Sequence, residues 1–324
     1  MSISVLLATF NRASLLEQCL AQLGRQTFET GDEIVVADNG STDTTAAIVE
    51  AAARRLRAPV RYVRETAPGK SHALATAVAI SHGEILALTD DDVIVADDWL
   101  ATIRALWQEA DLGLAGGRVT PRWERPAPRW LRLQAAGGYG RLAAPLALLD
   151  YGPGRTPLGA RTALGANMAV ARRALEAAGG FPLDLGKLRG TLLSGEDHQV
   201  CERVQAAGFT AVYDPRLVVQ HHVPADRLRL GYHLRWFFWS GITNAALDHA
   251  GAAAGASART RHWAARISRH AARAMRAALA AAPDRAVEAM TEIAFALGYL
   301  AFTRGWMRAH VGRGNAGSRR LEVT

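Results

Sequence analysis

The first 120 residues of the chain alternate between short apolar runs and longer stretches of helical composition. The apolar runs are rich in β-branched residues and predict strands at 3–8, 33–37, 60–63, 85–88 and 112–119. The stretches between them predict helices at 14–24, 44–56, 71–81 and 97–110. Strands that alternate with helices of this length form βαβ units in a largely parallel sheet. Helices cover both faces of such a sheet, which accounts for strands that are nearly continuous apolar runs.

The pattern changes after residue 120. Residues 120–165 contain six prolines, many glycines and four aromatic residues, so we expect irregular backbone there and interpret the segment as an active-site cover. The alternative is a surface insertion. Sheet-type segments then return up to residue 224, with predicted strands at 167–170 and 211–213 and helices at 172–178 and 196–207. Beyond that point the predicted elements are all helices, at 228–238, 257–281 and 284–309. We therefore expect an α/β domain at 1–225 and a helical extension at 226–324.

The net charge of +8 comes from the C-terminal extension. Residues 226–324 hold 15 arginines against 6 acidic residues, whereas residues 1–225 hold 23 basic and 24 acidic residues. One interpretation is a composition biased toward arginine and alanine. The other is a surface for an anionic partner, and the aromatic and basic segment 234–239 favours an anionic membrane surface, where each nearby cation adds about 1 kcal/mol of attraction. A helical appendage packed on the α/β domain remains the alternative.

Several classes of protein are disfavoured by the residues that the chain lacks. Two cysteines, Cys19 and Cys201, cannot form a disulfide framework or a multi-cysteine zinc site. The first residues do not resemble a signal peptide, and the apolar stretch 286–302 carries Glu288 and Glu292, so we expect no membrane span. We expect a cytoplasmic protein, peripheral on the inner face of the cell membrane if 226–324 binds lipid. No G-x-G-x-x-G, P-loop or G-x-S-x-G motif stands in the required context.

Three consecutive acidic residues, Asp90, Asp91 and Asp92, follow the predicted strand 85–88. Ligands of open α/β sheets bind beyond the carboxyl ends of the strands. Three adjacent carboxylates repel one another unless a cation lies among them. Their hard oxygens suit Mg²⁺ or Mn²⁺, and Mg²⁺ commonly binds one or two carboxylates together with phosphate oxygens. We interpret the triplet as a metal site rather than as a solvated turn that caps the next helix.

Three further groups carry chemistry that the residues alone leave open. Asp38, after the second predicted strand, is placed to accept hydrogen bonds from a nucleobase or ribose, or to cap a helix. Asp197, at the start of a predicted helix, is a general-base candidate, although capping is the simpler interpretation. The pair His221 and His222 offers an imidazole to a metal site, or a structural histidine.

Several segments stand in a characteristic order over roughly residues 5–224. They are Ala8-Thr9-Phe10-Asn11-Arg12, 33–43, Gly69-Lys70-Ser71 leading to the acidic triplet, Gly165-Ala166-Asn167, Gly195-Glu196-Asp197, and His221 with Pro224. Taken together, these segments resemble the family 2 glycosyltransferases, in which proline stands at the position of Ala8 and many members carry asparagine at the position of Ala75. The resemblance implies the GT-A fold, a Rossmann-like three-layer α/β sandwich with a mostly parallel central sheet, here followed by the C-terminal helical extension.

The resemblance implies an inverting glycosyltransferase that uses Mg²⁺ or Mn²⁺. Its donor would be a nucleotide-diphospho-sugar, above all a UDP-sugar, and its acceptor a saccharide or lipid-linked hydroxyl in polysaccharide, glycolipid or other glycoconjugate biosynthesis. Asp197 would deprotonate the acceptor, and Asn167 and Glu196 would lie on the acceptor side. The residues that would bind the donor nucleotide are Thr9, Arg12, Asp38, Lys70 and Asp90. The residues that would bind the metal are Asp90, Asp92 and His221.

Three alternatives remain. A nucleotidylyltransferase can share this kind of sheet, but it tends to carry a glycine-rich basic signature where this chain has Thr9-Phe10-Asn11-Arg12. A nucleic-acid-binding module on the basic extension would show affinity that falls steeply with salt. The extension shows no helix-turn-helix or RNA-binding signature, so we expect no nucleic-acid partner. A catalytically inactive relative is disfavoured because Asp92 and Asp197 are both present.

Overall fold

The computed structural model of the chain describes residues 1–109, 111–183, 192, 195–251 and 256–305. Within these residues the chain divides into two compact units. Unit 1 comprises 1–124, 134–183 and 195–223, and unit 2 comprises 125–133, 192 and 224–305. The segment 306–324, with the end of the last predicted helix, lies outside the described residues.

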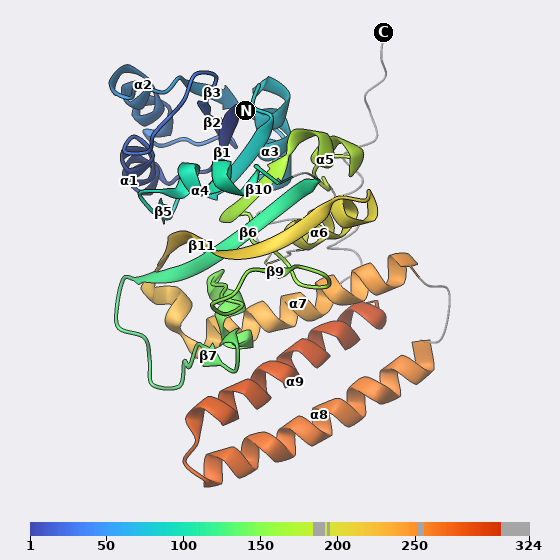
Figure 1. Ribbon diagram of the computed structural model, residues 1–324. Coiled ribbons are helices and arrows are strands. Elements are labelled where there is room, and N and C mark those ends of the chain that lie inside the picture. The colour runs from blue at the N-terminus through green and yellow to red at the C-terminus, as the bar shows by residue number, and fades with distance from the viewer. Residues whose placement is uncertain (110, 184–191, 193–194, 252–255, 306–324) are drawn as a thin grey trace. The chain divides into compact units, whose positions relative to one another are not determined.

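Unit 1 is built on one mixed sheet. Its nine described strands follow the order β3-β2-β1-β4-β10-β6-β11-β5, and β9 pairs with β11 (Figure 1). Six strands run parallel, and only β5, β9 and β10 run against them. The prediction of a mostly parallel sheet in an α/β fold is confirmed. The strands are β1 (Ile3–Thr9), β2 (Glu33–Asp38), β3 (Val60–Arg64), β4 (Ile85–Asp90), β5 (Val93–Val95), β6 (Leu112–Trp123), β9 (Thr156–Pro157), β10 (Asn167–Ala171) and β11 (Thr210–Val223).

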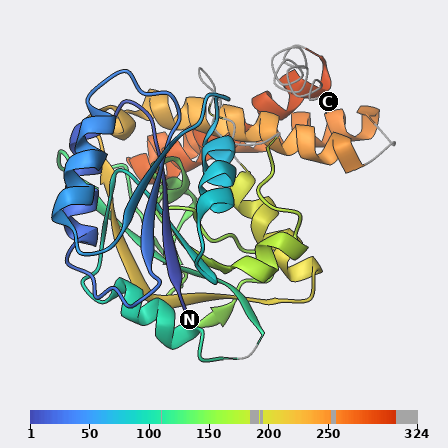
Figure 2. The same ribbon diagram turned by 90° about the horizontal axis from the view of Figure 1, so that it is seen from above.

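Helices cover both faces of this sheet. The strand order β3-β2-β1 proceeds in one direction and then returns to β4, so right-handed crossovers place α1 and α2 on one face and α3 on the other. Figure 2 shows the first strands between these two sets of helices. This three-layer arrangement brings the carboxyl ends of β1, β2 and β4 to one edge. The helices of unit 1 are α1 (Ala13–Leu23), α2 (Thr45–Arg55), α3 (Lys70–Ile80), α4 (Trp99–Leu106), α5 (Arg172–Ala177) and α6 (Glu196–Ala206).

The strand β11 is much longer than the predicted 211–213. Pro215 suggests a strand end because proline cannot donate a ladder hydrogen bond. The structure instead passes Pro215 in a register shift between Asp214 and Val218, and the strand continues beside β6. The Asp214 carboxylate accepts from the Arg216 backbone N–H at 2.9 Å, which stabilises the bulge. The continued strand carries His221 to the carboxyl edge of the sheet.

The segment 120–165 is mostly irregular, as predicted, but it contains short regular elements. The strand β6 continues through Pro121 to Trp123. The hairpin of β7 (Gln134–Ala135) and β8 (Gly138–Tyr139) and the 3₁₀ turn η1 (Arg141–Leu146) follow. The role of this segment as an active-site cover stays a prediction.

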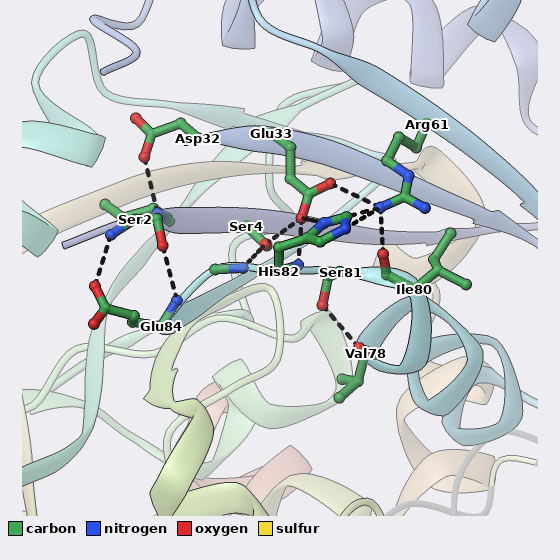
Figure 3. A network of polar contacts seen from close by, with 12 residues as sticks. Ser2, Ser4, Asp32, Glu33, Arg61, Val78, Ile80, Ser81, His82 and Glu84 are labelled. Carbon is green, nitrogen blue, oxygen red and sulfur yellow. Dashed lines mark hydrogen bonds and ion pairs between the residues drawn. The ribbon is translucent and has the colours of Figure 1, made fainter. Parts of the chain in front are cut away.

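A polar network locks the opposite, amino-terminal edge of the sheet (Figure 3). One oxygen of Glu33 accepts from Ser4 Oγ at 2.7 Å and from the His82 backbone N–H at 2.6 Å. Arg61 lies 3.4 Å from the other oxygen of Glu33. These contacts join β1, β2 and β3 to the turn that precedes β4, which sets the register of the strands.

Unit 2 consists of helices and the segment 125–133. Its elements are the turn η2 (Ala225–Leu228) and the helices α7 (Leu230–Gly251), α8 (Ala256–Leu279) and α9 (Pro283–Thr303). The helix α9 lies beside both α7 and α8 (Figure 1). An added Cβ on Gly298 would lie 1.8 Å from the Phe238 carbonyl oxygen, so glycine permits a direct backbone contact between α9 and α7.

Among the described residues, α9 is the one helix with the length and composition to cross a membrane. However, 44% of its apolar window is buried within the structure, and a core helix passes the same test. Inside unit 2, Tyr299 donates to Asp248 at 2.8 Å and Arg132 lies 3.3 Å from Asp284. These contacts tie α9 to α7 and to the segment 125–133.

Candidate active site

The sheet register places the predicted donor-side residues at one edge. Thr9, the last residue of β1, pairs with Asp38, the last residue of β2. On the other side of β1, Ala8 pairs with Asp90, the last residue of β4. The side chains just beyond these pairs therefore come together where ligands of open α/β sheets bind.

Arg12 and Thr9 hold the second and third acids of the triplet. One amino group of Arg12, Nη1, donates to Asp91 Oδ1 at 3.0 Å and to Asp92 Oδ2 at 2.8 Å. Thr9 Oγ1 donates to Asp91 Oδ2 at 2.7 Å. Burial raises the pKa of Asp91 to about 6, with help from the charges of Asp92 and Asp90, although Arg12 and Thr9 act to lower it. Asp91 is therefore the anchor of the cluster rather than a ligand-facing group.

The loop that carries Arg12 is itself held in place. Asn11 adopts a left-handed backbone conformation with φ of 52°, which asparagine tolerates better than most residues. Its backbone N–H donates to Ser41 Oγ at 2.9 Å, and its side-chain oxygen accepts from the Thr42 N–H at 2.8 Å. The turn after β1 is thus fastened to the turn after β2, which orients Arg12 toward the acids.

Asp92 and His221 form the candidate metal centre. His221 Nε2 lies 3.4 Å from Asp92 Oδ1, and both side chains are buried. The backbone fixes their approach, because His222 N–H donates to the Asp92 carbonyl at 2.8 Å. Adjacent ligands of an octahedral ion with bonds of about 2.1 Å lie about 3 Å apart, so these two atoms fit a shared Mg²⁺ or Mn²⁺. Among the described residues, no three or more histidine, cysteine, aspartate or glutamate side chains are grouped so that they could hold a metal ion. Phosphate oxygens and water would therefore complete the coordination of the ion.

Lys70 links the donor-side acids to the predicted base. Its amine forms an ion pair with Asp90 Oδ1, and both side chains are about one-fifth exposed. Burial acts to lower the pKa of Lys70, but the negative charges of Asp90 and Asp197 raise it above its ordinary value. Lys70 starts α3, and its loop is tied down because Asn39 accepts from the Gly69 N–H at 2.8 Å and donates to the Ala67 carbonyl at 2.7 Å.

Asp197 lies in the first turn of α6. Its Oδ2 accepts from the Gly165 N–H at 2.9 Å. An added Cβ on Gly165 would lie 2.8 Å from Asp197 Oδ1 and 3.5 Å from Lys70 Nζ, so this close approach requires glycine. Burial and the neighbouring Glu196 raise the pKa of Asp197 to about 7, although Lys70 and the Gly165 N–H act to lower it. A carboxylate with this pKa is suited to general-base chemistry near neutral pH.

Asp38 lies at the same edge, deeper in the sheet. Its two oxygens accept from the Ser41 N–H and from the Tyr62 hydroxyl, both at 2.7 Å, and only 1% of the residue is exposed. Burial and the hydrogen bond to Asp38 raise the pKa of Tyr62 to about 12. Asp38 therefore shapes this end of the site through two protein contacts, and its role toward a nucleotide stays a prediction.

Asn167 differs from the other predicted site residues. Its side chain is fully buried, its oxygen accepts from Trp99 Nε1 at 2.9 Å, and its amide nitrogen donates to the carbonyls of Arg118 and Leu217 at 2.9 Å. The amide thus joins three parts of the core. Its place on the acceptor side stays a prediction. Glu196 is buried next to Asp197, and its place on the acceptor side stays a prediction.

The structure thus joins Thr9, Arg12, Lys70, Asp90, Asp92, His221 and Asp197 in one cluster on unit 1, with Asp38 at the same edge. The separate role of Asp91 and the ties made by Tyr62, Asn39 and Gly165 were not predicted from the sequence. No local signal distinguishes Asp91, because Asp91 and Asp92 lie together in the turn beyond β4 and both contact Arg12 Nη1.

Comparisons with known proteins bear on the family and the fold of the chain. The sequence profile of Glycosyl transferase family 2 matches residues 4–176, which is more than half of the chain. An uncharacterized protein, y4gI of Sinorhizobium fredii, is 30% identical over 69% of this chain and 25% of its own length. The succinoglycan biosynthesis protein ExoM of Rhizobium meliloti is 28% identical over 66% of this chain and 64% of its own length. The chain therefore spans a quarter of the first relative and under two thirds of the second.

A solved structure has a similar fold. The mannosyltransferase PcManGT of Pyrobaculum calidifontis, in complex with GDP-Man and Mn²⁺, aligns with a TM-score of 0.58 over 99% of this chain and 76% of its own. The identity is 21%, so this likeness establishes the GT-A-like fold and not the substrates. With the profile match over residues 4–176 and this fold, the chain belongs to glycosyl transferase family 2.

Proposed function

We propose that the chain transfers a sugar from a nucleotide-diphospho-sugar to an acceptor hydroxyl, with inversion at the anomeric carbon. The observation that carries the proposal is the single cluster of Asp92 with His221, Lys70 with Asp90, and Asp197 at the carboxyl edge of the sheet. Such a cluster supplies cationic groups and metal ligands for a diphosphate and a base for an acceptor. Each part has a separate task.

The donor side consists of basic and metal-binding groups. Arg12 and Lys70 are the cations of this edge and would attract the donor diphosphate. Asp92 and His221 would hold Mg²⁺ or Mn²⁺, whereas Asp90 pairs with Lys70 and its part in metal binding stays a prediction. A bound divalent ion would neutralise diphosphate charge and stabilise the departing nucleoside diphosphate. Support for Mn²⁺ comes from the complex of PcManGT, which contains it.

The acceptor side consists of Asp197. Its pKa of about 7 lets it take the proton of the acceptor hydroxyl near neutral pH. The oxygen would then displace the nucleoside diphosphate in line. Lys70, which pairs with Asp90 and feels the charge of Asp197, connects the donor-side groups to the base. The C1–O bond to the diphosphate breaks as the bond to the acceptor oxygen forms.

The substrate class is drawn from the names of relatives. ExoM is a succinoglycan biosynthesis protein, and another relative is a glucosyl-dolichyl phosphate glucuronosyltransferase of Haloferax volcanii. We therefore propose a saccharide or lipid-linked acceptor in polysaccharide or glycoconjugate biosynthesis. A UDP-sugar is the first donor to test, and GDP-sugars follow because PcManGT was solved with GDP-Man.

The test is a donor screen with purified full chain and Mn²⁺. Nucleoside diphosphate release from UDP-, GDP- and dTDP-sugars would be measured with and without oligosaccharide or lipid-linked acceptors. We expect release from one donor class, with Asp197→Asn lowering turnover at least a hundredfold, within the usual contribution of a general base. Glu50→Gln, an exposed carboxylate on α2, is the matched control and should retain full turnover.

The same assay separates the main alternative. A nucleotidylyltransferase would release or consume pyrophosphate instead of nucleoside diphosphate. No release from any donor class, or unchanged release by Asp197→Asn, would contradict the proposal.

A further inference from the structure

The helix α8 has an unusual charge composition for a helix of a folded unit. Its 24 residues include six arginines and no aspartate or glutamate. The proposed transfer reaction uses none of these residues, because the site described above lies wholly in unit 1. The charge on α8 therefore needs a separate physical account.

Three of the arginines share one exposed stripe. Arg269, Arg273 and Arg276 follow one another at helical spacing and are all exposed. Residues four and then three positions apart lie on the same side of a helix. The three guanidinium groups therefore face solvent along two turns of α8.

An exposed apolar stripe runs beside the arginines. Met275 is 65% exposed and Leu279 is 85% exposed, and they continue the line of exposed Ala272. These are two of the most exposed large apolar side chains among the described residues. An isolated exposed apolar side chain is ordinary, but here the apolar stripe adjoins the basic stripe on one helix.

Two of the three acids of α9 pair with groups outside the exposed stripe of α8. Glu292 of α9 lies 3.8 Å from His270, which is on the packed side of α8 together with buried Ala277. Asp284 of α9 pairs with Arg132 at 3.3 Å. Glu288 is the exposed acid of α9. Between residues 268 and 279, the described exposed side chains of α8 thus include no acid and consist of the arginines, apolar groups and Ser268.

We propose that this outer face, defined by Arg269, Ala272, Arg273, Met275, Arg276 and Leu279, docks on the surface of an anionic lipid bilayer. Met275 and Leu279 enter the boundary between headgroups and acyl chains, and the arginines contact lipid phosphates. An amphipathic basic helix binds a membrane through these two contributions together. Phosphates of a nucleic acid would satisfy the arginines alone and would leave the apolar stripe in water, so lipid is the better match.

The test uses the full chain and vesicles of defined composition. Binding to phosphatidylcholine vesicles and to vesicles with 30% phosphatidylglycerol would be measured by flotation. We expect binding to the anionic vesicles that weakens as salt is raised. Each arginine near an anionic surface contributes roughly fivefold to partitioning, so the triple variant R269Q/R273Q/R276Q should bind about a hundredfold more weakly.

Three further variants separate charge, apolar contact and folding. R54Q/R55Q/R57Q removes three exposed arginines from the end of α2 and the turn after it, and should bind like the wild type. R269K/R273K/R276K keeps the charge of α8 and should also bind. M275S/L279S should weaken binding at all salt concentrations, because it removes the salt-independent contribution. Circular dichroism checks that each variant keeps its helix content.

The outcomes are distinct from those of the donor screen. Absence of binding to anionic vesicles would overturn the proposal, as would equal binding by R269Q/R273Q/R276Q and the wild type. Equal losses in the α2 and α8 glutamine variants would also overturn it, since net charge alone would then explain binding. Transfer to a soluble acceptor should be unchanged in the α8 variants.

Discussion

Gly165 sets the position of the proposed base, and its replacement by alanine makes a sharp test of the site. The added Cβ would lie 2.8 Å from Asp197 Oδ1, whereas ordinary contacts begin at 3.4 Å. Asp197 must therefore retreat by about 0.6 Å or rotate away from the Gly165 N–H. A misplacement of about 1 Å can cost a factor of about 100 in rate, so we expect Gly165→Ala to lower kcat about tenfold.

The assay is steady-state transfer with donor titration. The donor KM should change little, because the added Cβ lies 3.5 Å from the donor-side Lys70 Nζ, an ordinary contact that requires no shift. Thermal melting checks folding, since overpacking alone costs about 1–3 kcal/mol. Gly231→Ala, where an added Cβ meets nothing within 4 Å, is the matched control. Unchanged kcat in a folded Gly165→Ala protein would refute the assigned position of Asp197.

Three other predictions follow from single contacts. Turnover should fall as the pH drops below about 7, because Asp197 becomes protonated. In Lys70→Met this fall should begin at higher pH, because Lys70 lowers the pKa of Asp197. A pH profile of kcat checks both expectations. Thr9→Val should lower the free energy of unfolding by about 1.5–3 kcal/mol in urea denaturation, since Asp91 loses a buried hydrogen bond. Gly298→Ala should destabilise unit 2 by about 3 kcal/mol or more in the same measurement, because its Cβ meets the Phe238 carbonyl oxygen.

The sheet and its functional edge were predictable because their signals are local. The strands β1, β2 and β4 are nearly continuous apolar runs, and Asp38 and Asp90 stand at the ends of β2 and β4, close to where the predicted runs stop. The position of a strand end identifies the sheet edge without any knowledge of long-range contacts. The acidic triplet could therefore be assigned to a site before its geometry was known.

The features that could not be predicted from the sequence depend on contacts between distant segments of the chain. In the sequence, Asn167 is a polar residue in an apolar run, which suggests a ligand-facing amide. In the structure, this amide forms hydrogen bonds with Trp99, Arg118 and Leu217, which come from other parts of the chain. The different roles of Asp91 and Asp92 depend on Arg12 and Thr9, which are 79 and 82 residues away from Asp91 in the sequence. Pro215 suggested a strand end because the bulge that accommodates it depends on pairing with β6.

The charge of the C-terminal helices also shows the difference between what composition predicts and what only the fold reveals. Composition revealed the excess of arginine, but only the fold shows that Arg269, Arg273 and Arg276 face outward beside Met275 and Leu279. The prediction of a membrane-facing extension thereby becomes a proposal about one helix face. This proposal is tested independently of the proposed chemistry of unit 1.

The most direct test of the central claim is calorimetric binding of the nucleotide-sugar donor, with and without Mn²⁺, to the wild type, Asp92→Ala and Asp197→Asn. The account predicts that Mn²⁺ strengthens donor binding to the wild type and to Asp197→Asn, and that Asp92→Ala loses this metal-dependent gain. Donor binding that is indifferent to Mn²⁺, or that keeps its full metal dependence in Asp92→Ala, would contradict the assignment of this edge as the sugar-transfer site.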